Sequence, residues 1–350
     1  MGSIGLPGSG DARGRYWAGL GLGVSIGAGV AVQARLNGEL GERLGDGLAA
    51  AAISFGSGLA VLLVVLAVHP RLRAGLARVR AGLRTNTRSA AAGSHSAESV
   101  AARLRWWELL GGLCGAFFVA SQGLTVAMLG VTVFTVAVVS GQLVSSLVVD
   151  RLGAGPADRT PVTPWRLAGA ALALTAVVAT AAGRPDNAVA GPASDILRGV
   201  PTAVLVLLPA LAGIGLAWQQ AVNGRVGVVG GPLSATFVNF AVGTAALLVV
   251  EVLLRVRVGW SMRFPAEPWL YLGGLIGVVF IAAAVLAVRW IGVLLLGLTS
   301  VAGQLSMSLL LDAVVPTGPG LSLSALIGCL LTFVAVAVAA RGRPGGEADN

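Results

Sequence analysis

Charged residues are scarce in this sequence, and so are the residues that form disulfides and metal sites. Asp, Glu, Lys and Arg together make up 11% of the 350 residues, and the chain holds two Cys and two His. Two cysteines cannot form a disulfide framework, and His69 and His95 alone cannot form a metal cluster. We therefore expect no metal and no cofactor. So little charge also argues against two soluble domains, which the length alone would allow.

Apolar residues are correspondingly abundant. They make up 56% of the sequence, and the mean hydropathy is +0.86. Apolar runs close to the roughly 20 residues that cross a bilayer recur along the chain. The fold class we expect is an all-α integral membrane protein. The net charge of +9 comes from Arg residues in short connectors, which is typical of membrane topology rather than of nucleic-acid binding.

The chain contains an internal repeat. The segment 27–38 returns at 213–224 with its Gly, Gly, Gln, Asn and Gly residues 186 positions apart. A second block, 107–150, aligns with 269–312 without a gap. One unit therefore occurs twice in this sequence.

The apolar segments predict ten helices in two sets of five. The first repeat should occupy 17–183 and the second 200–340. We place the helices at 17–36, 47–69, 107–128, 131–150, 165–183, 200–222, 233–254, 269–288, 290–312 and 321–340.

Four segments are expected to lie outside these helices. They are a disordered tail over 1–16, a linker over 184–199, a C-terminal tail over 341–350, and a basic cytoplasmic loop over 70–105. The basic loop holds eight Arg and one acid. An amphipathic surface helix is an alternative there, but we favour a solvated loop held at an anionic leaflet.

The distribution of arginine predicts the orientation. With both termini in the cytoplasm, the inner segments hold 17 of the 24 basic residues and the outer segments 7. An odd number of helices in each repeat then makes the second repeat enter the membrane upside down. Inverted-topology repeats are typical of secondary transporters.

Repeated polar residues within the spans are the candidate site residues. Gln142 and Gln304 fall near the middle of their helices, where an amide must find a partner or a cavity. Interhelical hydrogen bonding and substrate contact are both open for them. Asp150 and Asp312 lie at helix C-termini, where the helix dipole disfavours an anion, so they are candidates for gating or proton coupling. Ordinary loop acids, with Asp150 paired to Arg151, are the alternative.

A second repeated pair closes the first helix of each repeat. Asn37 and Asn223, each followed by Gly, are interpreted first as C-caps. That does not account for Gln33 and Gln219 one turn earlier, so all four are gating candidates. Four other polar residues could line a cavity, namely Ser54, Gln122, Gln220 and Asn239. The aromatic residue Trp218 could line it as well. For Trp218, lipid or core packing is the alternative.

The motifs resemble those of the drug/metabolite transporter superfamily, and most closely its YdcZ-like branch of inner-membrane exporters. They are G-x-x-x-Q-x-x-x-N-G in each repeat, Ser54-Phe55-x-x-Gly58 with Asn239-Phe240-x-x-Gly243, and Gly141-Gln142 with Gly303-Gln304. The resemblance implies a multi-pass protein of a bacterial-type inner membrane that transports small molecules. The first helix lacks the Glu that small multidrug exporters of this superfamily use.

The sequence thus predicts a secondary active transporter of the plasma membrane that exports a small polar or amphipathic metabolite or drug by alternating access. Its partners would be the lipid bilayer, the solute and protons as a coupling ion. The alternative is a non-transporting membrane scaffold or lipid-binding protein. An enzyme is not expected, because Gly21-x-Gly23 followed by Gly27 departs from the dinucleotide spacing.

Overall fold

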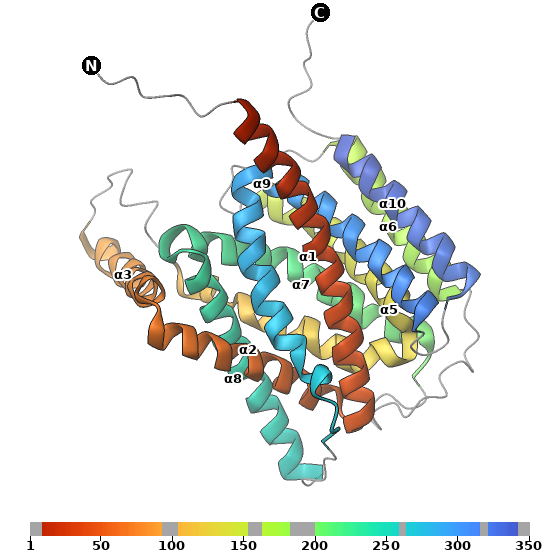
Figure 1. The fold of residues 1–350 in the computed structure, drawn as a ribbon, viewed down its shortest axis with the longest axis horizontal. Helices are drawn as coiled ribbons and strands as arrows, with labels where there is room; N and C mark the ends of the chain where they lie inside the picture. Colours follow the sequence, from red (N-terminus) through yellow and green to blue (C-terminus); the bar gives the residue numbers. More distant parts are fainter. Residues whose placement is uncertain are drawn as a thin grey trace, which may run out of the picture.

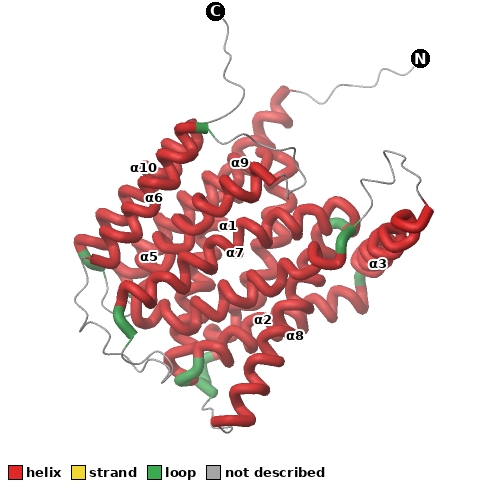
Figure 2. The backbone as a smooth tube through the Cα atoms, turned by 180° about the vertical axis from the view of Figure 1, so that it is seen from behind, coloured by secondary structure: helices red, strands yellow, loops and turns green. Residues whose placement is uncertain are grey.

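The chain folds as a bundle of tilted helices (Figures 1 and 2). The computed structural model describes residues 9–92, 104–152, 163–182, 200–258, 264–315 and 321–341, and within these residues it contains no strand. The helices are α1 (Ser9–Leu44), α2 (Gly47–Val68), α3 (Pro70–Ala92), η1 (Trp106–Leu110), α5 (Gly111–Leu152), α6 (Pro164–Ala182), α7 (Thr202–Gly230), α8 (Pro232–Val258), η4 (Pro268–Leu272), α9 (Gly273–Val314) and α10 (Leu323–Arg341).

Within the described residues, six helices are long and apolar enough to cross a membrane. One of them, Trp106–Val149, contains two of the predicted spans, and three shorter apolar helices lie at Pro164–Thr180, Pro268–Ala284 and Leu323–Ala339. Each of the ten predicted helices therefore has a counterpart, and the all-α membrane class is confirmed. The start of α1 and the end of α10 lie toward the same side of the bundle (Figure 1).

The predicted end of the first helix in each repeat is wrong. α1 continues past Asn37 to Leu44, and α7 continues past Asn223 to Gly230. The left-handed residues that end these helices are Gly45, with a φ of 68°, and Gly231, with a φ of 88°. These two glycines are 186 positions apart, so both repeats have the same turn after their first helix. The Asn-Gly pairs do not cap these helices. The side chains of Asn37 and Asn223 bond residues on other helices instead.

Two boundaries of the predicted irregular segments are also corrected. α1 begins at Ser9, so the expected disordered tail does not extend over residues 9–16. The predicted basic loop is a helix from Pro70 to Ala92. Its apolar residues Leu72 and Val79 are buried, and its sequence holds six Arg and no acid. The amphipathic helix that we ranked second is therefore the arrangement found, because one face packs on the ends of α7 and α8.

The break between the third and fourth predicted helices is at Gly130. This residue has a φ of 76° and a ψ of 160°, inside the otherwise continuous α5. That backbone region is essentially restricted to glycine. The residues before and after Gly130 therefore form two helices that meet at a bend.

Replacing Gly130 with Ala should lower the free energy of unfolding by about 1–3 kcal/mol, because a side chain is strained at this backbone conformation. The measurement is the thermal unfolding midpoint in detergent. Gly56→Ala is the matched control, because a Cβ at Gly56 meets no atom within 4 Å and its helix gains intrinsic propensity. An unchanged midpoint for Gly130→Ala would contradict the strain argument.

The two repeats contact each other through two equivalent helix crossings. α1 packs against α9, and α7 packs against α5. At the first crossing, a Cβ at Gly27 would overlap the carbonyl oxygen of Ser300, and at the second a Cβ at Gly213 would overlap that of Val138. Close backbone approach at glycine is the usual basis of helix association in membranes. The same residues of the repeat therefore make both contacts.

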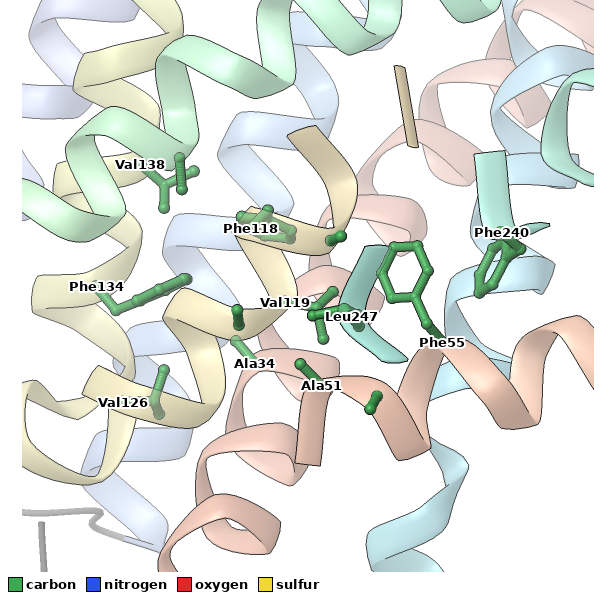
Figure 3. Packing of buried hydrophobic residues seen from close by; sticks show 14 of the residues in the cluster. Ala34, Ala51, Phe55, Phe118, Val119, Val126, Phe134, Val138, Phe240 and Leu247 are labelled. Carbon is green, nitrogen blue, oxygen red and sulfur yellow. The ribbon is translucent and has the colours of Figure 1, made fainter. Parts of the chain in front are cut away.

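The core lies where these crossings meet. Its buried apolar residues come from α1, α2, α5, α7, α8 and α9 (Figure 3). Within it, the rings of Phe55 of α2 and Phe240 of α8 contact each other, with centroids 5.0 Å apart. The ring of Phe55 lies against Gly243, and the ring of Phe240 lies against Gly58. The two repeats therefore exchange the same aromatic contact.

Candidate functional site

Two clusters of buried amide side chains lie beside the central phenylalanine pair. The first-repeat cluster consists of Gln33, Asn37, Ser54 and Gln122, none of which is more than 3% exposed. Gln33 Nε2 donates to the carbonyl oxygen of Gly273 at 2.7 Å, and Asn37 Nδ2 donates to Gln122 Oε1 at 2.7 Å. Three helices of the first repeat and the start of α9 thus meet in this cluster.

The second-repeat cluster consists of Gln219 and Asn239, which are buried, and Asn223, which is half-buried. Gln219 Nε2 and Asn223 Nδ2 both donate to Asn239 Oδ1, at 2.7 and 3.0 Å. The amide groups of Gln219 and Asn223 lie against Gly115 and Gly111 at the start of α5. This placement repeats the first cluster, in which Gln33 and Asn37 lie against Gly277 and Gly273 at the start of α9.

The phenylalanine pair lies between the two clusters. A Cβ at Gly115 would meet both Gln219 Nε2 and Phe55 Cζ, and a Cβ at Gly277 would meet both Gln33 Nε2 and Phe240 Cζ. Each ring therefore adjoins one cluster, and the rings contact each other. The order across the centre of the bundle is amide cluster, two aromatic rings, amide cluster.

The predicted pair Gln142 and Gln304 lies on α5 and α9, outside these two clusters. Gln304 is 5% exposed, and its Nε2 atom has no hydrogen-bond partner within the described protein. Gln142 is half-buried. The serine residues one turn further on, Ser146 and Ser308, donate to carbonyl oxygens of their own helices. Substrate contact by either glutamine stays a prediction.

Asp312 has a structural role that the sequence analysis missed. It is 3% exposed, and its two carboxylate oxygens accept from the backbone N–H groups of Val131, at 3.1 Å, and Thr132, at 2.7 Å. These groups begin the helix that follows the bend at Gly130. A carboxylate at a helix N-terminus is favourable. Asp312 is disfavoured by the dipole of its own helix, but it stabilises the start of another helix. The side chain of Asp150 lies outside the described residues.

Two other candidates lie away from the amide clusters. Gln220 is exposed at the surface of the bundle. Trp218 is half-buried, and its ring stacks on that of Trp107, with centroids 5.6 Å apart and an interplanar angle of 28°. The guanidinium of Arg105 lies 5.9 Å from the centroid of Trp107. Packing, the alternative interpretation of Trp218, accounts for this arrangement.

Ion pairs lie at the ends of α1 and α7. Glu108 of η1 is 2% exposed; it accepts from Arg225 Nε and from the backbone N–H of Arg105 at 2.7 Å. At the equivalent end of α1, Arg43 pairs with Glu267, just before η4. A backbone hydrogen bond and the pair with Arg43 lower the pKa of Glu267. The internal repeat does not predict these two ion pairs, because Glu108 and Glu267 do not occupy equivalent positions in the two repeats.

These ion pairs therefore lie near helix ends, and the amide clusters hold no ionisable side chain. In the part of the chain that the structure describes, no group of three His, Cys, Asp or Glu side chains could hold a metal ion. The two clusters can donate and accept hydrogen bonds, and that is the chemistry they offer.

Comparisons with known proteins give one family. The profile of the family described as "Putative inner membrane exporter, YdcZ" matches residues 18–179 and 204–338. A search of curated proteins finds no significant match. A solved structure titled "Crystal structure of protein" is 19% identical, with a TM-score of 0.48, over 93% of this chain and 97% of that one.

Proposed function

Since this chain belongs to the YdcZ family of inner membrane exporters, we propose that it is a secondary active transporter that moves a small polar or amphipathic solute out of the cell. The proposal rests on one observation: two matched clusters of buried amide groups flank the aromatic pair where the repeats meet. Polar groups buried within membrane helices are costly and mark solute pathways. A pathway between the repeats would pass these groups.

The mechanism we propose is alternating access between two inverted repeats. The reciprocal contacts support it, because Gly27 of α1, packed against α9, and Gly213 of α7, packed against α5, are equivalent residues at equivalent crossings. Two such crossings would let the repeats exchange conformations, so that one faces the cytoplasm as the other faces outward. Both termini would then be cytoplasmic, an orientation that the excess of Arg in the inner segments supports.

Protons are the coupling ion we propose, with Asp312 and Asp150 as the candidate acids. Asp312 supports this because protonation of its carboxylate would weaken the hydrogen bonds to Val131 and Thr132 that join the two repeats. A bound proton would in that way favour one arrangement of the bend at Gly130. The gating residues we propose are Gln33, Asn37, Gln219 and Asn223, since each lies against a glycine at the start of α9 or α5 in the other repeat, beside the phenylalanine pair.

Transport is tested by reconstituting the full chain in liposomes. Uptake of radiolabelled sugars, nucleosides and neutral amino acids is measured with and without a pH gradient, and empty liposomes are the baseline. We expect uptake of at least one solute class that a pH gradient accelerates. Folded protein that moves none of them would overturn the proposal and favour the membrane scaffold or lipid-binding protein.

Replacing Gln304 or Gln142 with Leu should reduce transport about tenfold or more if these amides contact the solute, because one lost hydrogen bond to a buried polar group is worth about 1–3 kcal/mol. The matched control is Gln220→Leu, the same chemical change at an exposed position, which should leave transport unchanged. Uptake rates are compared at equal amounts of folded protein. Equal rates for Gln304→Leu and the control would exclude Gln304 from the pathway.

A further inference from the structure

The two amide clusters occupy equivalent positions but differ in composition. Gln33 and Asn37 correspond to Gln219 and Asn223, so the amides of the first helix are the same in both repeats. The remaining positions differ in a compensating way. The second repeat has Asn239 where the first has Ser54, and it has Ala284 where the first has Gln122.

Asn239 closes the second-repeat cluster on itself. Its side chain is long enough for Oδ1 to accept from Gln219 and Asn223 at once. The donors of both neighbours are thereby used within the protein. Of the buried polar atoms in this cluster, Gln219 Oε1 has no hydrogen-bond partner.

The first-repeat cluster is open by comparison. Ser54 is too short to bridge Gln33 and Asn37 as Asn239 bridges its neighbours, so Gln33 donates instead to Gly273 and Asn37 donates instead to Gln122. Each of the four side chains keeps one atom without a hydrogen-bond partner. These atoms are Gln33 Oε1, Asn37 Oδ1, Ser54 Oγ and Gln122 Nε2. Two of them are close together, because both Asn37 Oδ1 and Ser54 Oγ lie against Gly273.

Buried polar atoms in folded proteins are hydrogen-bonded almost without exception, to protein, water or ligand. Four such atoms in one cluster are expensive for the fold, and the second repeat demonstrates that a composition with fewer of them packs at the same crossing. The first composition therefore has a use other than stability. Its free atoms are two amide oxygens, one hydroxyl and one amide N–H.

We propose that the first-repeat cluster is the solute-binding subsite of the transporter and that the second-repeat cluster is a gate contact that binds no solute. The inference rests on the proposed transport function. The ligand class is a neutral solute rich in hydroxyl groups, such as a polyol, sugar or nucleoside. Its hydroxyl protons would bond Gln33 Oε1 and Asn37 Oδ1, and a hydroxyl oxygen would accept from Gln122 Nε2. No ionisable side chain belongs to the cluster, and an ion without a counter-charge is strongly disfavoured there.

The test exchanges the compositions of the two clusters. The variant Ser54→Asn with Gln122→Ala gives the first cluster the residues of the second, and Asn239→Ser with Ala284→Gln makes the reverse change. Each variant is studied as the full chain, first by its thermal unfolding midpoint in detergent and then by uptake of labelled glycerol, glucose and uridine into liposomes. Choline and lactate are the charged comparison solutes.

We expect the first variant to unfold at a higher temperature than the original chain and to lose uptake by tenfold or more, since the solute loses the hydrogen bond from Gln122 Nε2. The reverse variant should unfold at a lower temperature while folded protein keeps its affinity for the solute, measured as the KM of uptake. If either fails to fold, Ser54→Ala and Asn239→Ala replace them, with the solute affinity lowered in the first and stability lowered in the second.

Three outcomes would overturn the inference. They are unchanged uptake by the first variant, the same rise in the KM of uptake in both variants, and transport of choline or lactate in preference to the hydroxyl-rich solutes. Failure of the proposed function is distinct from these, because in that case the original chain moves no solute. The unfolding midpoints would then still decide whether the first cluster is the less stable one.

Discussion

Gly27→Ala is expected to destabilise the protein by about 2–3 kcal/mol, at the upper end of the cost of overpacking. Gly27 lies where α1 crosses α9. An added methyl group there would overlap the carbonyl oxygen of Ser300 and approach the backbone nitrogen of Gln304. Neither atom belongs to a flexible side chain, so the clash is relieved only if the two helices separate. The crossing also joins the two repeats, and its loss should loosen the whole bundle.

The matched control is Gly29→Ala, two residues further along the same helix. A Cβ at Gly29 meets only Ile276 and Phe280, at 3.9 and 4.0 Å, which is ordinary contact. This change should stabilise the helix by about 0.5–1 kcal/mol, since alanine has the higher helix propensity. The unfolding midpoint and the fraction of protein that elutes as a single species in detergent measure both. Gly27→Ala with the stability of Gly29→Ala would refute the tight crossing.

Asp312→Asn is expected to cost about 2–3 kcal/mol. The carboxylate accepts two backbone hydrogen bonds in a buried position, from Val131 and Thr132, and bonds to a charged group are worth about 1.5–3 kcal/mol each. Asparagine can accept one of the two with its oxygen, but its NH₂ group then faces the other donor. The start of the helix after Gly130 would lose half of its cap.

Asp46→Asn is the control for this change. Asp46 accepts from Leu48 N and Ala49 N, both at 2.9 Å, at the N-terminus of α2 in a half-buried position. Asn is about as good as Asp at an exposed helix N-cap, so this change should alter the unfolding midpoint little. Equal midpoints for the two variants would show that burial and the contact between repeats add nothing to the role of Asp312.

The pH dependence of transport separates the two roles of Asp312. If Asp312 also binds the coupling proton, the folded Asp312→Asn protein should lose the acceleration by a pH gradient. If its role is only to cap the helix, the variant should be less stable but keep the gradient dependence. Asp46→Asn provides the reference profile in the same liposomes.

Several elements could be predicted from the sequence because their signals are local. Gly130 separates two apolar runs, and the structure has its break at this residue. The repeat placed Gln33 with Gln219 and Asn37 with Asn223 at equivalent positions, and these pairs make equivalent contacts. A helix over Pro70–Ala92 was within reach of the same reasoning, since Leu72, Leu76, Val79 and Leu83 recur at helical spacing. The high Arg content of this segment favours a loop, whereas its helical period favours the helix that the structure shows.

Other features could not be predicted because they depend on which helices meet. The acceptor role of Asp312 joins residues about 180 positions apart, and no local pattern records that contact. Asn37 and Asn223 have the composition of helix caps, but partners on other helices keep them within continuous helices. Glu108 pairs with Arg225. The equivalent position of the second repeat is Leu270, so the repeat does not indicate this pair.

The sequence by itself determined that this protein lies in a membrane, that it is one unit written twice, and where most of its helices run. Hydropathy and periodicity decide these properties, and both add up residue by residue along the chain. The tertiary structure alone decided the partner of each buried polar group. A hydrogen bond depends on distance and direction between groups on different helices, so the exchange of Ser54 and Gln122 for Asn239 and Ala284 acquires its meaning only at the crossing where those helices meet.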